Sequence, residues 1–156
     1  MNALHIRKAT INDLEELLTF EQGVIRAERP LDPTLKEDPV RYYDIEKMIG
    51  APNVELLVAE FEGAIIASGY ARIEDSKLFY QHPKHVYLGF MYVVPEHRGK
   101  GVNKKIIEAL ESWSLKNNIT EIWLDVYHNN EAAIKAYERA GFSRYILSMR
   151  KELLAI

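Results

Sequence analysis

Residues 87–110 read YLGFMYVVPEHRGKGVNKKIIEAL and combine three local patterns in one stretch. An apolar, partly aromatic run ends at Pro95, and a short basic turn with two glycines follows it. From Val102 onward, apolar residues recur at helical spacing. The stretch therefore predicts a strand, a tight turn and a helix.

The turn in this stretch has the properties of an anion site. The first N–H groups of a helix have no partner within the helix and carry the positive end of its dipole. Gly99 and Gly101 let an anion approach the backbone closely, and Arg98, Lys100 and Lys104 add positive charge. These features suit a phosphate or pyrophosphate. A plain strand-to-helix turn, with lysines for solubility, fits the turn alone equally well.

Length and composition limit the classes of protein to consider. A chain of 156 residues with 47% hydrophobic and 28% charged residues predicts one globular domain over residues 1–156. The net charge of −3 gives no footprint for nucleic acid, and the absence of cysteine excludes a thiolate nucleophile. The five histidines are scattered, so no metal site is expected. The N-terminal sequence lacks a signal-peptide core and no apolar run could span a membrane, so a cytoplasmic location is expected.

The periodicities along the chain predict a mixed α/β sheet. Strands are expected at residues 4–8, 54–61, 64–74, 86–94, 121–127 and 142–151. Helices are expected from the N-cap Thr10 to about residue 27, from Pro39 to residue 49, from Gly101 to about residue 117, and from the N-cap Asn130 to Gly141. Glu62 and Gly63 form a two-residue hairpin turn, and residues 75–84 form a polar loop.

A second motif lies near the C-terminus, where residues 130–142 read NEAAIKAYERAGF. This segment meets every fixed position of the pattern N-x-x-A-I-x-x-Y-x-x-x-G-F, and the earlier loop matches the pattern R/Q-x-x-G-x-G/A at Arg98 and Gly101 but has Asn103 at its third position. Together with the run 91–95, MYVVP, these two segments resemble the GCN5-related N-acetyltransferase (GNAT) superfamily. Neither a complete P-loop nor the G-x-G-x-x-G dinucleotide fingerprint is present.

The resemblance implies an acyl-CoA N-acyltransferase fold with a central, mixed and splayed sheet flanked by helices. It also implies acetyl-CoA as co-substrate, with a bulge in the strand 86–94 that opens a slot for it. The residues expected to bind acetyl-CoA are Met91, Tyr92, Val93, Arg98, Gly99, Lys100, Gly101, Val102, Asn103, Lys104, Asn130, Ala133 and Tyr137. Among these, Tyr137 is expected to be the general acid that protonates the leaving thiolate; without the motif it would be interpreted as a core tyrosine.

The implied reaction is direct transfer from acetyl-CoA to a primary amine in a ternary complex, because a chain without cysteine offers no thiolate for an acetyl-enzyme. The amine must lose a proton, and the strand 86–94 carries no carboxylate. The candidates for the base are a water relay or one of Glu55, Glu74, His82, His85 and Tyr92.

The acceptor is open between a small-molecule amine and a peptide amine. Acidic residues outnumber basic ones in residues 13–46, which favours a cationic acceptor, although an ordinary solvated pair of helices has the same composition. Aromatic residues that could line its pocket are Tyr42, Tyr43, Phe79, Tyr80, Tyr87 and Tyr92. The alternative function is a non-catalytic acyl-CoA binding or sensing module. A homodimer through residues 153–156, LLAI, is a further hypothesis, and a frayed tail is its alternative.

Overall fold

The computed structural model describes residues 3–154, which separate into two compact units. The first unit reaches to Asp125 and the second begins at Val126. The prediction of one domain over residues 1–156 stays a prediction.

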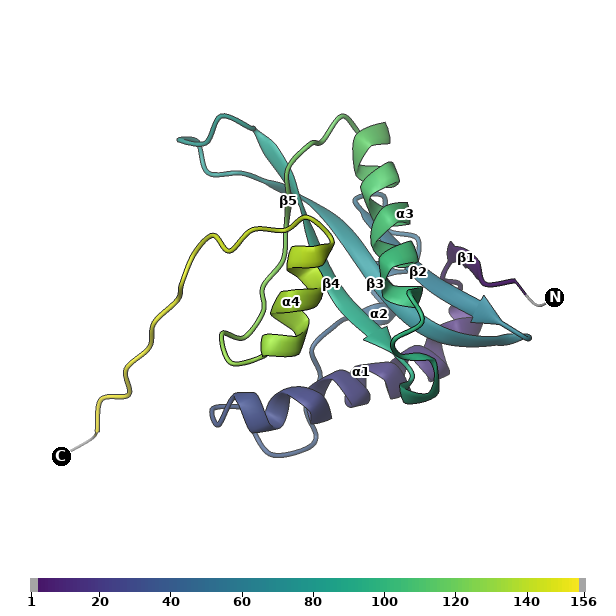
Figure 1. Cartoon of the computed structure of the whole chain (residues 1–156), viewed down its shortest axis with the longest axis horizontal. Helices are drawn as coiled ribbons and strands as arrows, with labels where there is room; N and C mark the ends of the chain where they lie inside the picture. The colour runs from purple at the N-terminus through teal and green to yellow at the C-terminus, as the bar shows by residue number, and fades with distance from the viewer. Residues whose placement is uncertain (1–2, 155–156) are drawn as a thin grey trace. The chain divides into compact units, whose positions relative to one another are not determined.

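A five-stranded mixed sheet forms the centre of the first unit (Figure 1). Its strands follow the chain order β1-β2-β3-β4-β5, and only β4 and β5 pair in parallel. The strands are β1 (His5–Lys8), β2 (Val54–Phe61), β3 (Ala64–Asp75), β4 (Lys84–Val93) and β5 (Ile122–Trp123). The predicted mixed sheet is confirmed. The predicted β2–β3 hairpin is also confirmed. Glu62 and Gly63 in its turn have positive φ angles of 52° and 82°, which a two-residue hairpin turn of this type requires.

Helices cover both faces of this sheet. Leu56 and Val58 of β2 pack in one core cluster with α1 (Leu14–Glu28), so Leu57 between them points to the other face. The register pairs Leu57 with Gly69, and a Cβ on Gly69 would lie 2.8 Å from Ile106 of α3 (Val102–Lys116). The two long helices therefore lie on opposite faces, and each buries an apolar stripe.

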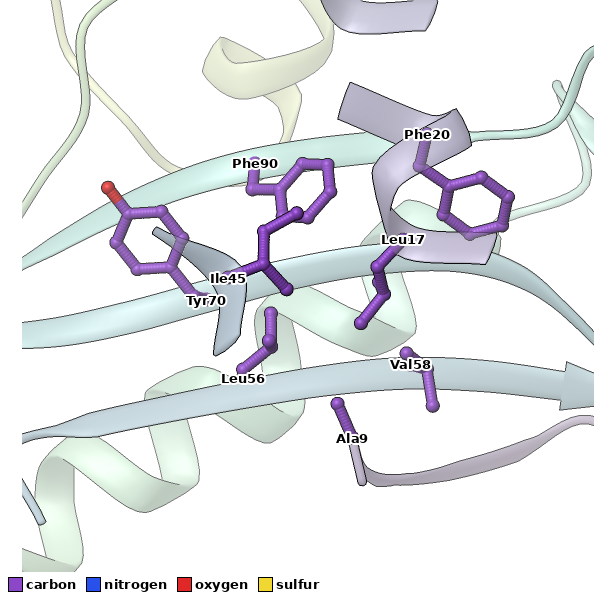
Figure 2. Close-up of a cluster of buried hydrophobic side chains, with 8 residues drawn as sticks. All are labelled: Ala9, Leu17, Phe20, Ile45, Leu56, Val58, Tyr70 and Phe90. Carbon is purple, nitrogen blue, oxygen red and sulfur yellow. The ribbon is translucent and has the colours of Figure 1, made fainter. Parts of the chain in front are cut away.

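The core on the α1 face is drawn in Figure 2. Its buried members come from α1, α2 (Ile45–Met48), the strands β2, β3 and β4, and the residue that follows β1: Ala9, Leu17, Phe20, Ile45, Leu56, Val58, Tyr70 and Phe90. Thr10 begins a 3-10 turn, Ile11–Asp13, that leads into α1, and the Asp13 carboxylate accepts the Thr10 N–H at 2.8 Å. The predicted N-cap at Thr10 and the predicted first helix are thus confirmed.

The predicted helix from Pro39 to residue 49 is wrong over its first half, because α2 begins only at Ile45. The fully buried carboxylate of Glu21 in α1 accepts the backbone N–H groups of Tyr42 and Tyr43 at 2.9 and 2.7 Å. Those amides are therefore satisfied from another element, and residues 39–44 form no helix before Asp44 caps α2.

Two strand predictions near the C-terminus are also wrong. The strand predicted over 121–127 is reduced to Ile122–Trp123, and residues 142–154, which belong to the second unit, contain no strand. The apolar residues of that segment are exposed: Tyr145, Ile146, Leu147, Met149, Leu153 and Leu154. An alternating pattern favours a strand, but a strand also needs a neighbour for its hydrogen bonds. Ala155 and Ile156, which belong to the dimer hypothesis, lie outside the described residues.

Candidate active site

Strand β4 carries a bulge opposite Gly69. Ser68 pairs with Tyr92 and Tyr70 pairs with Gly89, so the two residues Phe90 and Met91 oppose the single residue Gly69. Phe90 has a φ of 56°, in the left-handed region that residues with a Cβ seldom adopt. The bulge expected from the family resemblance is therefore present.

Two neighbours on β3 accommodate this bulge. The hydroxyl of Ser68, which is fully buried, donates to the Phe90 carbonyl at 2.9 Å. A Cβ at Gly69 would lie 2.7 Å from the Met91 sulfur, so a larger residue there would require the Met91 side chain to shift. The hydrogen bond satisfies a carbonyl that the irregular ladder would otherwise leave without a partner.

The outer edge of β4 is open beyond the start of the strand. Parallel pairing with β5 covers only Val86 and Tyr87, so within residues 3–154 no strand lies beside residues 88–93 on that edge. The Val94 N–H bonds the Ile66 carbonyl on β3, and successive amides of a strand point to opposite edges. The Val93 N–H therefore points to the edge away from β3, and the pairing of β5 with only two residues of β4 is what a splayed arrangement requires.

The loop after β4 leads directly to the N-terminus of α3. A 3-10 turn, Pro95–His97, follows the strand, and the Arg98 Nε donates to the Val93 carbonyl at 2.8 Å. The guanidinium lies 5.6 Å from the centre of the Tyr92 ring. Arg98 is thus a residue that closes the turn, and its charge stays at the end of β4.

The glycines of this loop border open space. Gly99 and Gly101 have φ of 75° and 79°, and a Cβ built on either one would meet no atom within 4 Å. Gly101 is the N-cap of α3, so the unpaired amides of the first helical turn follow at once. The Asn103 side-chain oxygen is buried and has no hydrogen-bond partner in the described structure. An open glycine cradle and unpaired helix amides fit an elongated polar anion such as a pyrophosphate, whereas the Asn103 oxygen is an acceptor and suits a donor group instead.

The second unit contains the other predicted site residues on α4 (Glu131–Arg139). The Asn130 side chain caps this helix by accepting the Ala133 N–H at 3.3 Å. At the other end, Gly141 has a φ of 101°, and the Phe142 N–H bonds the Tyr137 carbonyl at 3.0 Å. The Tyr137 and Phe142 rings lie 5.8 Å apart, edge to face. These contacts form a Schellman ending, and they explain the Tyr, Gly and Phe of the motif structurally.

The structure thus places the predicted cofactor residues in two groups. Met91, Tyr92, Val93 and the residues 98–104 lie together at the end of β4 and the start of α3. Asn130, Ala133 and Tyr137 lie together on α4 in the second unit.

A cavity of about 740 Å³ opens in the first unit beside β3 and β4. It is lined by Tyr42, Tyr43, Asp44, Lys47, Met48, Ala51, Val54, Tyr70, Arg72, Glu74, Tyr87 and Asp125. Three of the predicted aromatic residues, at 42, 43 and 87, line it, whereas Tyr92 packs against Phe20 with ring centres 5.0 Å apart. Sequence reasoning missed Arg72 and Asp125. The alternation Tyr70, Arg72, Glu74 on β3 was the available signal for the first of them.

The polar side chains of the cavity are organised around its tyrosines. The Arg72 guanidinium lies 5.5 Å from the centres of both the Tyr70 and Tyr87 rings, and it pairs with Glu74 at 2.6 Å. The Tyr87 hydroxyl donates to Asp125 at 3.2 Å. Burial raises the pKa of the Tyr43, Tyr70 and Tyr87 phenols, and the Asp125 charge adds to the rise at Tyr87. These phenols therefore stay protonated at neutral pH.

The candidates for the base differ in where they lie. Glu74 lines the cavity, whereas Glu55 pairs with Lys8 at 3.4 Å. His85 is buried behind Glu74, with its ring nitrogens 3.2 Å from the Glu74 carboxylate and 2.9 Å from the Ser76 hydroxyl. Of the five candidates, Glu74 is the one that lines the cavity.

The described part of the chain offers neither a metal-ligand cluster nor a membrane-spanning helix. Residues 3–154 contain no group of three or more His, Asp or Glu side chains placed to hold a metal ion. Among the same residues, no helix combines the length and the apolar character that crossing a bilayer requires.

Comparison with known proteins agrees with this geometry. The N-alpha-acetyltransferase 30 of Schizosaccharomyces pombe is 37% identical over 59 residues, which is 38% of this chain and 39% of that protein. Matches to three curated relatives span only 23% to 39% of their lengths. The crystal structure of a mutant BH1408 protein from Bacillus halodurans is 26% identical, covers 96% of this chain and 99% of that chain, and has a TM-score of 0.85.

Another solved structure, a predicted acetyltransferase with acetyl-CoA from Clostridium acetobutylicum, has the same fold. It is 20% identical, with a TM-score of 0.71 and coverage of 96% of each chain. A sequence profile described as "Acetyltransferase (GNAT) family" matches residues 13–142. The chain therefore belongs to the GNAT acetyltransferase family.

Proposed function

We propose that this chain transfers the acetyl group of acetyl-CoA to a primary amine, by direct attack in a ternary complex. The observation that carries the proposal is the bulged, open edge of β4, which runs into a glycine loop at the N-terminus of α3. An open strand edge can bond the amide groups of a pantetheine arm, and the loop amides can bond its pyrophosphate. The fold neighbour from Clostridium acetobutylicum, whose structure contains acetyl-CoA, supports this assignment.

The proposed contacts follow the chain. The backbone of Met91 and Val93 bonds the pantetheine arm, with Tyr92 between them. The amides of residues 99–104 surround the pyrophosphate, and Lys100 and Lys104 add charge at this exposed surface. On α4, Asn130 and Ala133 are proposed to face the pantetheine. The contacts proposed for β4 and the loop are supported by the open strand edge and the open glycine loop. The contacts proposed for α4 are supported by the sequence motif.

In the proposed reaction, the neutral amine nitrogen attacks the thioester carbon. A backbone N–H at the bulge stabilises the developing oxyanion, a new C–N bond forms, and the C–S bond breaks. Tyr137 gives its proton to the leaving thiolate while the nitrogen loses one proton to a base, so the protons balance. A phenol with an ordinary pKa of about 10 can protonate a thiolate of about 8.5 only when both are aligned and shielded from water.

The cavity beside β3 and β4 is the proposed acceptor site. The Tyr70 ring lines it and also covers Gly89, because a Cβ there would lie 2.6 Å from that ring. Gly89 directly precedes the bulge residue Phe90. An amine in the cavity can therefore approach the position at which the acetyl carbonyl would meet the bulge. The amine proton is proposed to leave through a relay of several waters, with Glu74, which lies four residues from Tyr70 along β3, as its final acceptor.

Replacing Tyr137 with phenylalanine tests the proposed acid. We expect Tyr137→Phe to lower kcat by about 100-fold or more, as loss of a general acid does, while the Kd for acetyl-CoA stays within about twofold. Release of CoA thiol gives the rate, and calorimetry gives the affinity. Tyr145→Phe, an exposed tyrosine of the same unit, is the matched control.

Unchanged turnover in Tyr137→Phe at saturating substrate would remove Tyr137 from the acid role. Tight acetyl-CoA binding with no thiol release from any acceptor class would instead favour the non-catalytic sensing module. A cytoplasmic location, a single domain over residues 1–156 and a homodimer remain predictions from the sequence.

A further inference from the structure

We propose that Asp125 receives the acceptor nitrogen in the cavity and is the first group to accept its proton, and that Tyr87 positions the Asp125 carboxylate for this step. The inference rests on the proposed function, because it assigns two further residues to the reaction at the same site. Asp125 is thereby a catalytic residue, and Tyr87 is a positioning residue.

The sheet register places Asp125 at the bulge end of the cavity. Tyr87 of β4 pairs in parallel with Trp123 of β5. Asp125 follows Trp123 by two residues, so the same register sets it beside Gly89. Gly89 directly precedes Phe90, the first residue of the bulge. The Asp125 carboxylate, which lines the cavity, therefore lies at the end where the acetyl carbonyl is proposed to meet the bulge.

The Asp125 carboxylate is held on one side and open on the other. One of its oxygens accepts the Tyr87 hydroxyl at 3.2 Å. Burial, and then the Asp125 charge, raise the pKa of the Tyr87 phenol, so this hydroxyl stays protonated at neutral pH and remains a donor. Asp125 is an exposed residue, and within residues 3–154 its second oxygen has no hydrogen bond or ion pair. That oxygen can accept an N–H of an incoming amine.

The cavity is lined by three carboxylates, those of Asp44, Glu74 and Asp125. The first of them caps the N-terminus of α2. One Glu74 oxygen accepts two nitrogens of Arg72, at 2.8 and 2.6 Å, and the other lies 3.2 Å from a ring nitrogen of His85. Glu74 also lies four residues from Tyr70, which is about 13 Å along β3. A proton relay that ends at Glu74 must therefore begin at a group nearer the bulge, and Asp125 is the lining carboxylate in that position.

The reaction needs a base at this position while the C–N bond forms. A protonated amine held at Asp125 first loses one proton to water, because only the neutral nitrogen can attack. When that nitrogen bonds to the thioester carbon it becomes positively charged and strongly acidic. The open Asp125 oxygen takes the proton, so an N–H bond breaks and an O–H bond forms. Asp125 then passes the proton to the water relay that ends at Glu74, while Tyr137 supplies the proton of the leaving thiolate.

A matched pair of ligands suits the test. The cavity wall combines tyrosine rings with the apolar side chains of Met48, Ala51 and Val54, which fits an arylalkyl group. The acceptor probe is 2-phenylethylamine, and 2-phenylethanol is its uncharged counterpart. We expect Asp125→Asn to lower kcat for the amine by about 100-fold, as loss of a general base does, while the Kd for acetyl-CoA stays within about twofold. Asp125→Glu, which keeps the carboxylate, should recover most of this loss.

A double-mutant cycle tests the positioning role of Tyr87. Tyr87→Phe keeps the ring and removes the hydroxyl that donates to Asp125. We expect it to lower kcat by about tenfold in the wild-type background and by less than twofold in the Asp125→Asn background. A purely structural role of Tyr87 would give the same factor in both backgrounds and would overturn this part of the inference. Glu16→Gln, which removes an exposed carboxylate from α1, is the matched control and should leave kcat unchanged.

Calorimetric titration of both ligands into the CoA-saturated protein separates the inference from the proposed function. We expect the amine to bind about fivefold more tightly than the alcohol, the size of one exposed ion pair, and Asp125→Asn to bring the two within about twofold. If this preference is found but no acceptor releases thiol, the transferase proposal fails alone and Asp125 remains the amine site. Thiol release from the amine by Asp125→Asn within about threefold of the wild-type rate overturns the inference and leaves the transferase standing. Equal binding of amine and alcohol by the wild type, without turnover of the amine, overturns it as well.

Discussion

Replacing Ser68 of β3 with alanine removes a buried side-chain hydrogen bond that stabilises the bulge of β4. The Ser68 hydroxyl is fully buried and donates to the Phe90 carbonyl at 2.9 Å. Phe90 itself has a φ of 56°, so the bulge contains a residue in an unfavourable conformation that its surroundings must stabilise. Ser68→Ala removes one of those stabilising contacts and changes no atom of the proposed cofactor site.

The expected loss of stability follows from the carbonyl that the variant leaves unsatisfied. A buried polar group without its partner costs about 1–3 kcal/mol. The left-handed conformation of Phe90 costs a further 1–2 kcal/mol or so, which the native contacts offset. If the bulge persists in Ser68→Ala, we expect a loss of about 1–3 kcal/mol in the free energy of unfolding. For a chain of this size that corresponds to a fall in Tm of roughly 2–12 °C.

Ser68→Ala is also expected to weaken acetyl-CoA binding, and this effect is more specific than the loss of stability. Relaxation of Phe90 to an extended conformation would turn the neighbouring Met91 amide and weaken its proposed bond to the pantetheine arm. We expect the Kd of Ser68→Ala for acetyl-CoA to rise by about five- to tenfold, the value of one hydrogen bond. Differential scanning calorimetry and isothermal titration calorimetry measure the two effects separately.

Ser114 provides the matched control for Ser68. Ser114 is also fully buried, and its hydroxyl donates to the Leu110 carbonyl at 2.8 Å within α3. The α-helical ladder already uses that carbonyl, so Ser114→Ala leaves no backbone group unsatisfied. A Ser68→Ala protein with the same acetyl-CoA affinity and the same Tm as Ser114→Ala would refute the role given to Ser68.

Two further predictions concern Glu21 in α1 and Asp13, which directly precedes this helix. Glu21→Ala should lower the free energy of unfolding by about 3 kcal/mol, because the part-buried amides of Tyr42 and Tyr43 each lose a hydrogen bond to a charged group and Arg41 loses its ion pair. Thermal unfolding followed by circular dichroism measures this loss, and a loss no larger than that of Glu16→Ala would contradict it. Arg7 donates to Asp13 at 2.8 Å and thereby lowers the pKa of that carboxyl. Asp13 therefore contributes stability that is present above its unfolded pKa of about 3.9 and is lost as the pH falls through its folded value. The Tm difference between the wild type and Asp13→Asn should shrink below pH 4, and a difference that does not change between pH 7 and pH 3 would contradict this linkage.

Elements with local signals were predictable from the sequence. The β2–β3 hairpin follows from Glu62-Gly63 between two alternating runs, and the cap at Asn130 and the stop at Gly141 define α4. The loop of residues 98–101 lies between strand and helix, as its composition indicates. In each case the residues that determine the conformation are only a few positions apart.

Elements that depend on distant partners were not predictable in this way. Residues 39–44 read as the start of a helix, but a carboxylate about twenty residues earlier, on Glu21, binds their amides. The apolar pattern of residues 142–151 favours a strand but contains no information on a pairing edge. The cavity shows the same limit, because Arg72 lies within β3 and Asp125 follows β5, and only the sheet register, through Tyr87 of β4, brings them to one cavity.

Residues 42 and 43 line the cavity and are held by Glu21, and this attachment has a consequence for how acceptor preference can change. Glu21 holds this loop through the main-chain N–H groups at positions 42 and 43, which every residue except proline possesses. The hydrogen bonds to Glu21 therefore do not depend on which side chains stand at positions 42 and 43, although those side chains line the cavity. If the cavity is the acceptor site proposed above, substitutions at these two positions change which amines bind while the loop keeps its path. The architecture thus separates a backbone anchor from the side chains that line the cavity, which suits laboratory selection of new acceptors.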